Sequence, residues 1–161
     1  MLASACLACR SADPKAELSV SEVETYWVVD SPVGSTQYIA PAVRFRVTNK
    51  GSRAWGSIQA TATFRRKGEE DKSWGSDWRP VTAPDKSLAP GEGVLVVMRS
   101  DSRYYSSGNA ESMFHHGLFR DAKVEIFLRI GASAWTKLSE SDIERRIGTR
   151  GLAAGATPPA P

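Results

Sequence analysis

The chain has 161 residues, of which 41% are hydrophobic and 24% charged, and its formal net charge is +3. This size and composition are typical of one globular domain with a substantial core. The 21 basic residues are interleaved with 18 acidic ones, and no apolar run is long enough for a transmembrane helix. Nucleic-acid binders gather their positive charge on one face, so nucleic acid is an unfavoured partner.

Residues 1–16 are predicted to be a signal-like or disordered N-terminal segment. The opening M-L-A-S-A-C-L-A-C is small and apolar, and it resembles the end of a bacterial export signal that runs into a mature linker. Within it, A-S-A-C is similar to a lipobox, in which Cys6 is the lipidated first residue. The alternative is a disordered start with two incidental thiols, Cys6 and Cys9. These are the only cysteines, so the body has neither a disulfide nor a four-cysteine zinc site.

The body, residues 17–148, is predicted to form a series of short strands. The first strand is Leu18–Val29, where a switch of apolar parity at Ser21 predicts a bulge. In the next two, Ala42–Lys50 and Ile58–Lys67, apolar residues alternate with polar ones, as in half-buried strands. A slip of one residue would bring arginines into the core, so the register is strongly specified.

Further strands are expected later in the chain. A short one is predicted over Trp78–Val81. The continuously apolar Val94–Met98 is expected to be buried on both faces or covered by another segment. A strand is predicted over Val124–Ile130, where every second residue is aliphatic, and another over Trp135–Leu138, after a turn. Ile143–Ile147 is expected to close the sheet, with a helical turn as the alternative.

Short strands separated by turns indicate an all-β protein. We expect a single antiparallel immunoglobulin-like β-sandwich of about seven strands, with a short helix in a long loop. Residues 149–161 are rich in Ala, Gly and Pro and cannot build a core. They are predicted to be a disordered tail.

Three segments of the body resemble a known family. They are V-T-N-K-G at Val47–Gly51, A-T-A-T-F at Ala60–Phe64 and L-A-P-G-E at Leu88–Glu92. Together they resemble the FxLYD-like, immunoglobulin-like domains of bacterial secreted proteins and lipoproteins. Arg65-Arg66 stands where that family has tyrosine and aspartate. The resemblance implies a non-catalytic binding or spacer module.

The long loop over residues 100–121 is the least sandwich-like stretch, and loops of this length usually have structure or function of their own. Asn109 is expected to cap a short helix. Four apolar residues would then plug one open end of the sandwich: Met113, Phe114, Leu118 and Phe119.

The alternative makes the same loop a partner-binding surface. It would expose Tyr104, Tyr105 and one of the two histidines, His115 and His116. In that case, replacing both tyrosines would abolish partner capture without changing the melting temperature. Adjacent histidines diverge in direction and rarely hold one metal, so we expect no metal site and no cofactor.

A second candidate surface is basic. The strands over residues 42–50 and 58–67 are expected to be neighbours, which would gather Arg44, Arg46, Arg65, Arg66 and Lys67 on one outer face. Such a face would bind a polysaccharide, a lipid headgroup or an acidic protein. The alternative is a solvated charged face, with Glu125 offsetting part of the charge.

Exposed tryptophans form the third candidate surface, a sugar-binding platform, because aromatic faces stack on sugars. Trp55 and Trp74 lie beside turns and are the better candidates for exposure, whereas Trp27 is expected in the core.

The sequence contains no nucleophile elbow and no phosphate-binding glycine loop, so we expect no enzymatic activity. The expected function is that of a non-catalytic envelope or secreted protein that binds another envelope protein or serves as an accessory subunit. The alternative is a carbohydrate-binding or anionic-polymer-binding module. The expected location is extracytoplasmic, in the periplasm or cell envelope, with the lipid at Cys6 as the only contact with a membrane.

Overall fold

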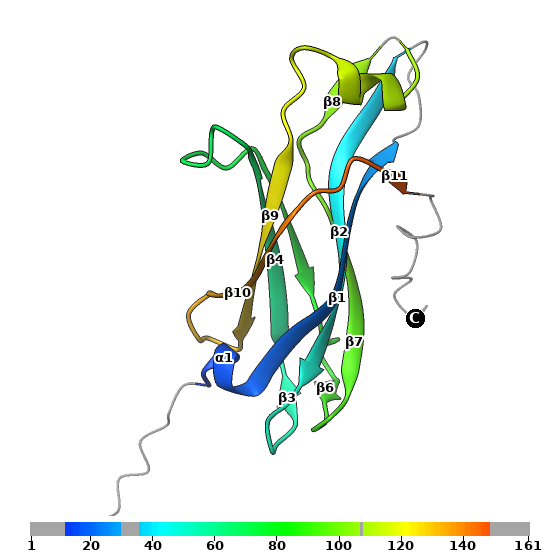
Figure 1. Cartoon of the computed structure of the whole chain (residues 1–161). Helices are drawn as coiled ribbons and strands as arrows, with labels where there is room; N and C mark the ends of the chain where they lie inside the picture. The colour runs from blue at the N-terminus through cyan, green and yellow to red at the C-terminus, as the bar shows by residue number, and fades with distance from the viewer. Residues whose placement is uncertain (1–11, 30–35, 107, 149–161) are drawn as a thin grey trace, which may run out of the picture.

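In a computed structural model, residues 12–29, 36–106 and 108–148 are described, and they form two β-sheets packed face to face (Figure 1). A short helix and a 3₁₀ helix accompany the strands: α1 (Pro14–Glu17) and η1 (Glu111–His115). The strands are β1 (Leu18–Val29), β2 (Gln37–Asn49), β3 (Trp55–Gly56), β4 (Ile58–Arg66), β5 (Gly75–Pro80), β6 (Ser87–Leu88), β7 (Gly93–Arg99), β8 (Tyr104–Ser106), β9 (Ala122–Ile130), β10 (Thr136–Asp142) and β11 (Ile147–Gly148).

The first sheet has the order β11-β1-β2-β7, with β8 also paired to β2, and the second has the order β10-β9-β4-β5. A small third pair joins β3 and β6. The pairs are antiparallel except for β1 with β11, which is parallel. The seven strands of six or more residues confirm the predicted all-β sandwich.

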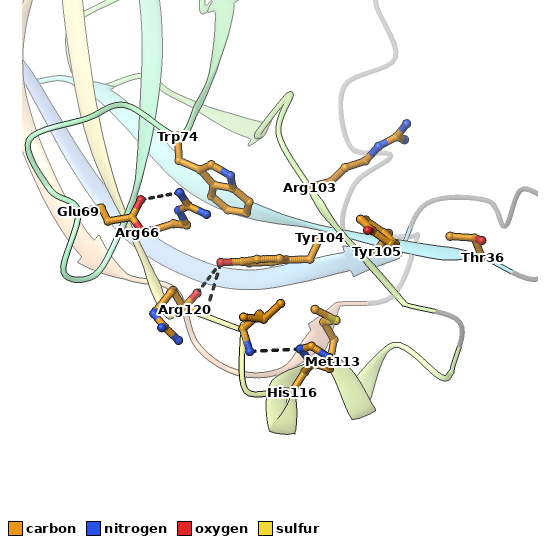
Figure 2. Close-up of a pocket in the computed structure, with 11 residues that line it drawn as sticks. Thr36, Arg66, Glu69, Trp74, Arg103, Tyr104, Tyr105, Met113, His116 and Arg120 are labelled. Carbon is orange, nitrogen blue, oxygen red and sulfur yellow. Dashed lines mark hydrogen bonds and ion pairs between the residues drawn. The ribbon is translucent and has the colours of Figure 1, made fainter.

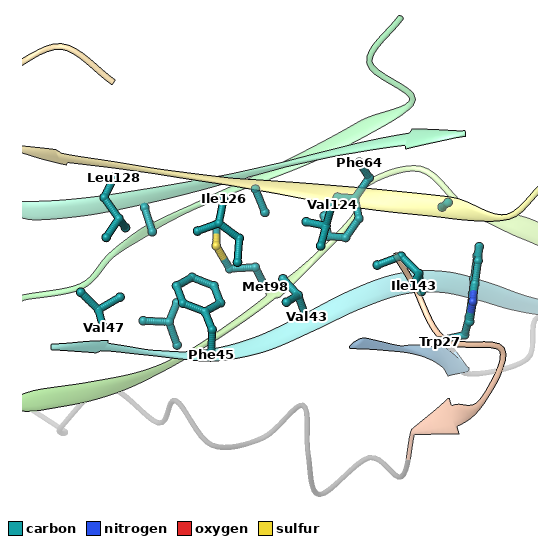
Figure 3. Packing of buried hydrophobic residues seen from close by; sticks show 14 of the residues in the cluster. Trp27, Val43, Phe45, Val47, Phe64, Met98, Val124, Ile126, Leu128 and Ile143 are labelled. Atoms are coloured by element: carbon teal, nitrogen blue, oxygen red, sulfur yellow. The ribbon is translucent and has the colours of Figure 1, made fainter. Parts of the chain in front are cut away.

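The core lies between the two sheets because apolar residues alternate along the facing strands (Figure 3). Phe45 of β2 and Phe64 of β4 are both fully buried, as is Ile126 of β9. Each such side chain stabilises the fold by about 1.5–3 kcal/mol relative to an exposed one. Alternation therefore defines the inner face of each sheet, as predicted.

The expected bulge lies in β1, where the pairing with β2 shifts register between Ser21 and Glu24. Glu22 adopts a positive φ of 50° there. A bulge adds one residue to one strand and so reverses its alternation. This allows Leu18 and Trp27, which have opposite parity in the sequence, to reach the same core.

One end of the sandwich is organised by Asn49, which is fully buried at the end of β2. Its Nδ2 donates to the carbonyl oxygens of Arg53 and Leu88, each at 2.8 Å, and its Oδ1 accepts from the Gly51 N–H at 2.9 Å. Its own N–H donates to the Glu92 carbonyl at 3.0 Å. Asn49 thus ties the N-K-G turn to the L-A-P-G-E turn. These are two of the segments on which the family resemblance rests.

Several boundaries differ from expectation. β7 lies at an edge, and its outward Leu95 and Val97 are only half-buried, so the strand is not buried on both faces. The segment before β11 is not helical. Ordered structure begins before residue 17, because Asp13 Oδ1 accepts from the Lys15 N–H and caps α1.

Cys6 and the predicted tail over residues 149–161 lie outside the described residues. In the part of the chain that the structure describes, no helix is both long and apolar enough to cross a bilayer.

Candidate functional site

The long loop closes the end of the sandwich opposite Asn49. β8 pairs with the first residues of β2, and η1 follows it. The N-cap position of η1 is Ala110, but the side chain of the preceding Asn109 accepts from the Ser112 N–H at 2.8 Å and so satisfies a first-turn N–H as predicted. Met113, Phe114 and Phe119 are buried as expected. Leu118 is 74% exposed, so its assignment to the plug was wrong.

Five rings pack together beneath this loop, and we call them the aromatic cluster: Trp27, Trp74, Tyr104, Phe114 and Phe119. Trp27 is fully buried at its centre, with ring centroids 5.1 Å from Phe119 and 5.9 Å from Tyr104. Trp74 and Tyr104 are 4.9 Å apart. Trp27 Nε1 is buried and has no hydrogen-bond partner among the described residues. The indole of Trp27 is therefore held by ring packing rather than by a hydrogen bond.

A groove of about 830 Å³ opens beside the aromatic cluster, and we call it the end groove (Figure 2). Its apolar lining combines Trp74 and Tyr104 with Met113, Tyr105 and Leu118. Its polar lining consists of Thr36, Arg66, Glu69, Arg103, His116 and Arg120. The groove therefore places aromatic surface directly beside positive charge.

The charged residues of the end groove differ in how they are held. Arg66 forms an ion pair with Glu69 through Nη2, while its Nε is buried without a partner in the described part of the chain. Arg120 Nη1 donates to the carbonyl oxygens of Gly117 and Phe119, both at 3.1 Å. Among residues 12–29, 36–106 and 108–148, no carboxylate forms an ion pair with Arg120.

Tyr104 connects the strand to the loop. Its hydroxyl accepts from the Arg120 N–H at 3.2 Å and donates to the Arg120 carbonyl at 3.4 Å. This holds the main chain of Arg120 against β8. A strand presents neighbouring residues on opposite faces, so Tyr105 points outward and is 71% exposed.

The prediction that both tyrosines are exposed is therefore correct for Tyr105 and wrong for Tyr104. Tyr104 is partly buried in the aromatic cluster, and only Tyr105 is available to a partner without loss of packing.

His115 and His116 are both exposed. His116 Nδ1 accepts from the Leu118 N–H at 3.2 Å, so the neutral ring carries its proton on Nε2 and can donate from there. His116 lines the end groove and His115 does not. Among the described residues, no group of three or more histidine, cysteine or acidic side chains could hold a metal ion.

The ion pair between Arg145 and Asp121, just before β9, lies against the aromatic cluster. Arg145 donates from Nε and Nη2 to the two carboxylate oxygens of Asp121, at 2.7 and 2.8 Å, and its Nη1 donates to the Phe114 carbonyl at 3.3 Å. Its guanidinium lies 5.4 Å from the ring centroid of Phe119. The hydrogen bonds from Arg145 hold the pKa of Asp121 below its ordinary value.

The predicted basic face is not formed. β2 and β4 belong to different sheets, so Arg44 and Arg46 lie on a different face from Arg65. Each is paired with a glutamate, as the ion pairs Arg44–Glu24 at 3.2 Å, Arg46–Glu22 at 2.9 Å and Arg65–Glu125 at 2.8 Å show. The expectation that Glu125 offsets part of the charge was right.

Of the predicted tryptophans, Trp74 lines the end groove, whereas Trp55 is half-buried and donates from Nε1 to Glu17 at 2.9 Å. The exposed tryptophans are instead Trp78 and Trp135, at 52% and 37%. Trp78 lies in β5 beside Thr61 of β4. Sequence reasoning missed both.

Leu118 and Arg120 were also not predicted as site residues. The signal available for them was the buried Phe119 between them, because neighbours of a buried residue in extended chain point outward.

The sequence matches no protein-family model, and no curated protein matches it. Among solved structures, a Bordetella pertussis protein provisionally assigned as ApaA is 16% identical over 79% of this chain and 92% of its own, with a TM-score of 0.43. A structural genomics target is 9% identical over 92% and 98%, with a TM-score of 0.46. An Archaeoglobus fulgidus protein is 17% identical over 78% and 96%, with a TM-score of 0.41. At these values no conclusion about function follows from the likenesses.

Proposed function

We propose that this protein is a non-catalytic binding protein that takes a segment of another protein into the end groove. The observation that carries the proposal is the lining itself. Tyrosine, tryptophan, methionine and arginine are the residues enriched where proteins bind one another, and all four line this groove. Among the described residues, Tyr105 and Leu118 are the large apolar side chains most open to solvent, at 71% and 74% exposure.

Two further features support this function. The aromatic cluster behind the groove is packed, so a partner would meet a surface that is already ordered. The resemblance of the Asn49 turn and its neighbours to FxLYD-like domains implies a non-catalytic binding or spacer module, and the proposal takes the first of these. An envelope or secreted location, with a lipid at Cys6, belongs to the same proposal.

Selection of a random twelve-residue peptide library on the full chain tests this function. We expect selected peptides whose binding is lost in Tyr105→Ala and Leu118→Ala. Both side chains are exposed, so both variants should keep their stability within about 0.5 kcal/mol. Trp135→Ala is the matched control, because it removes an exposed aromatic far from the groove. Peptides that bind all three variants equally well would contradict the proposal.

A second candidate function, carbohydrate binding, is favoured by one observation. Trp78, Thr61 and Phe127 lie in register across β5, β4 and β9 on the outer face of the second sheet. The guanidinium of Arg129, in β9 of that sheet, lies 4.6 Å from the ring centroid of Trp135, which precedes β10. Aromatic rings beside hydroxyl groups suit sugars. Quenching of tryptophan fluorescence by an oligosaccharide panel should disappear in Trp78→Ala and persist in Tyr105→Ala; the reverse pattern would contradict it.

A further inference from the structure

We propose that the end groove selects an acidic peptide segment, with a carboxylate held by Arg120 and an adjacent apolar side chain packed against Tyr105 and Leu118. This inference rests on the proposed function and specifies the chemistry of its partner. It draws on the charge balance of the lining and on the fixed geometry of one arginine.

The charge balance favours an anion. The described lining contains three arginines and a single carboxylate, that of Glu69. Glu69 is already engaged by Arg66 in an ion pair. The charge of Arg120 is therefore not matched by a carboxylate of the described lining, and a partner's carboxylate can neutralise it.

Arg120 is held in place without being neutralised. Two carbonyl oxygens accept from its Nη1, and its main chain is bonded to the Tyr104 hydroxyl. Carbonyl groups orient a guanidinium but do not cancel its charge. Its Nε and Nη2 make no hydrogen bond to any described residue, and the side chain is exposed. A guanidinium fixed in this way can form a charge-assisted, bidentate contact with a carboxylate at little further loss of entropy.

His116 adds a neutral donor to the same groove. Because its Nδ1 is engaged by the Leu118 N–H, its Nε2–H is the donor that a ligand can meet. The same hydrogen bond fixes the main chain of Leu118, whose side chain is part of the groove lining. The groove lining therefore holds a polar donor, His116, and an apolar side chain, Leu118, two residues apart in the chain, and a peptide with adjacent polar and apolar side chains could contact both.

The apolar lining argues against a polyanion such as nucleic acid. Polyanions bind rows of cations that follow their backbone, and their affinity rises with each phosphate contacted. Here five of the eleven described lining residues are aromatic or apolar, and Arg66 is already paired. A single acidic residue beside an apolar one fits this arrangement better than a chain of charges.

The test uses the peptides selected on the full chain from the random twelve-residue library. We expect Asp or Glu next to a leucine or aromatic residue in the strongest binders. Changing the acid of the strongest peptide to its amide should weaken binding about tenfold, or by about 1.4 kcal/mol, because a charge-assisted hydrogen bond is replaced by a weaker neutral one. Binding of the acidic peptide should also weaken as salt is raised.

Arg120→Gln separates the carboxylate contact from general effects. It should weaken the acidic peptide about tenfold and leave the amide peptide unchanged, which is the coupling that a double-mutant cycle measures. Lys86→Gln is the matched control, since it removes one exposed positive charge away from the groove and should change neither.

The outcomes distinguish the two proposals. Peptides that need Tyr105 and Leu118 but show no preference for acids overturn the inference and leave the proposed function standing. Equal effects of Arg120→Gln on the acidic and amide peptides also overturn the inference. If no selected peptide depends on Tyr105 or Leu118, both are overturned.

Discussion

The two ends of the sandwich are closed by opposite means. At one end, the buried Asn49 uses both polar atoms of its side chain to join two turns through hydrogen bonds of 2.8–2.9 Å. At the other, the buried Trp27 has an indole N–H that meets no acceptor among the described residues, and rings pack around it.

This difference shows where a binding site can form. Hydrogen bonds fix distances and directions, so the Asn49 end holds one arrangement of its turns. Ring packing is less directional, and the end groove lies beside the rings at the end that depends on it. The candidate site therefore lies at the end whose centre is a set of packed rings.

The largest expected effect is at the aromatic end. Trp27→Ala should lower the free energy of unfolding by about 3–5 kcal/mol, because it removes a fully buried ring from the centre of the aromatic cluster. Trp27→Phe should cost much less, since no hydrogen bond of the indole is lost. Urea unfolding of both variants measures this. An equal loss of unfolding free energy in Trp27→Phe and Trp27→Ala would contradict this, because it would mean that the indole N–H of Trp27 forms a hydrogen bond in the folded protein.

A slightly smaller effect is expected at the polar end. Asn49→Ala should lower the free energy of unfolding by about 3 kcal/mol, because it leaves buried backbone groups without partners. Asn109→Ala makes the same chemical change in the loop at the other end, where the side chain accepts one exposed bond from Ser112. Its cost should be about 1 kcal/mol or less. Equal losses of unfolding free energy in Asn49→Ala and Asn109→Ala would contradict the proposal that the two ends are closed by different interactions.

The smallest effect concerns pH. Asp121 has a lowered pKa in the folded protein, so its pairing with Arg145 stabilises the fold fully above the ordinary value of 3.8 and is lost as the pH falls below it. Because Arg145 also touches Phe114 and Phe119, near-UV circular dichroism of the rings should change below that pH before the far-UV signal does.

Asp121→Asn is the control for this prediction. It should remove most of the acid-dependent change in the near-UV signal, since an amide does not titrate. A change that persists in Asp121→Asn would assign the acid response to another carboxylate.

The sequence predicted individual strands well and their neighbours poorly. Leu18–Val29 and most of Ile58–Lys67 were recognised because alternation is a local property of the chain. Which sheet each strand joins is not local. The chain leaves β2, forms the two-residue β3 and enters β4 in the other sheet, and this separates Arg44 from Arg65. The alternation of apolar and polar residues within β2 or β4 does not indicate that the chain passes from one sheet to the other between them.

The candidate site was predicted only in outline. The long loop was recognised as the region of interest, and Tyr105, His116 and Trp74 do lie at the groove. Tyr104 could not be assigned to a side, because two adjacent tyrosines on a strand fit either face. Arg120 was missed because its role depends on the carbonyl groups that surround it, which become visible only when the loop is folded.

The contact between β1 and the segment before β11 has a consequence for biosynthesis. Thr25 donates to the carbonyl of Asp142, 117 residues further along the chain, and Trp27 pairs with Ile147 in the parallel ladder. A nascent chain that has not yet released these residues from the ribosome lacks the partner of one edge of β1, while β2 can already pair with the other edge. Trp27 and the strand edge beside it would then stay accessible to chaperones and to other nascent chains until residues 142–148 have left the ribosome.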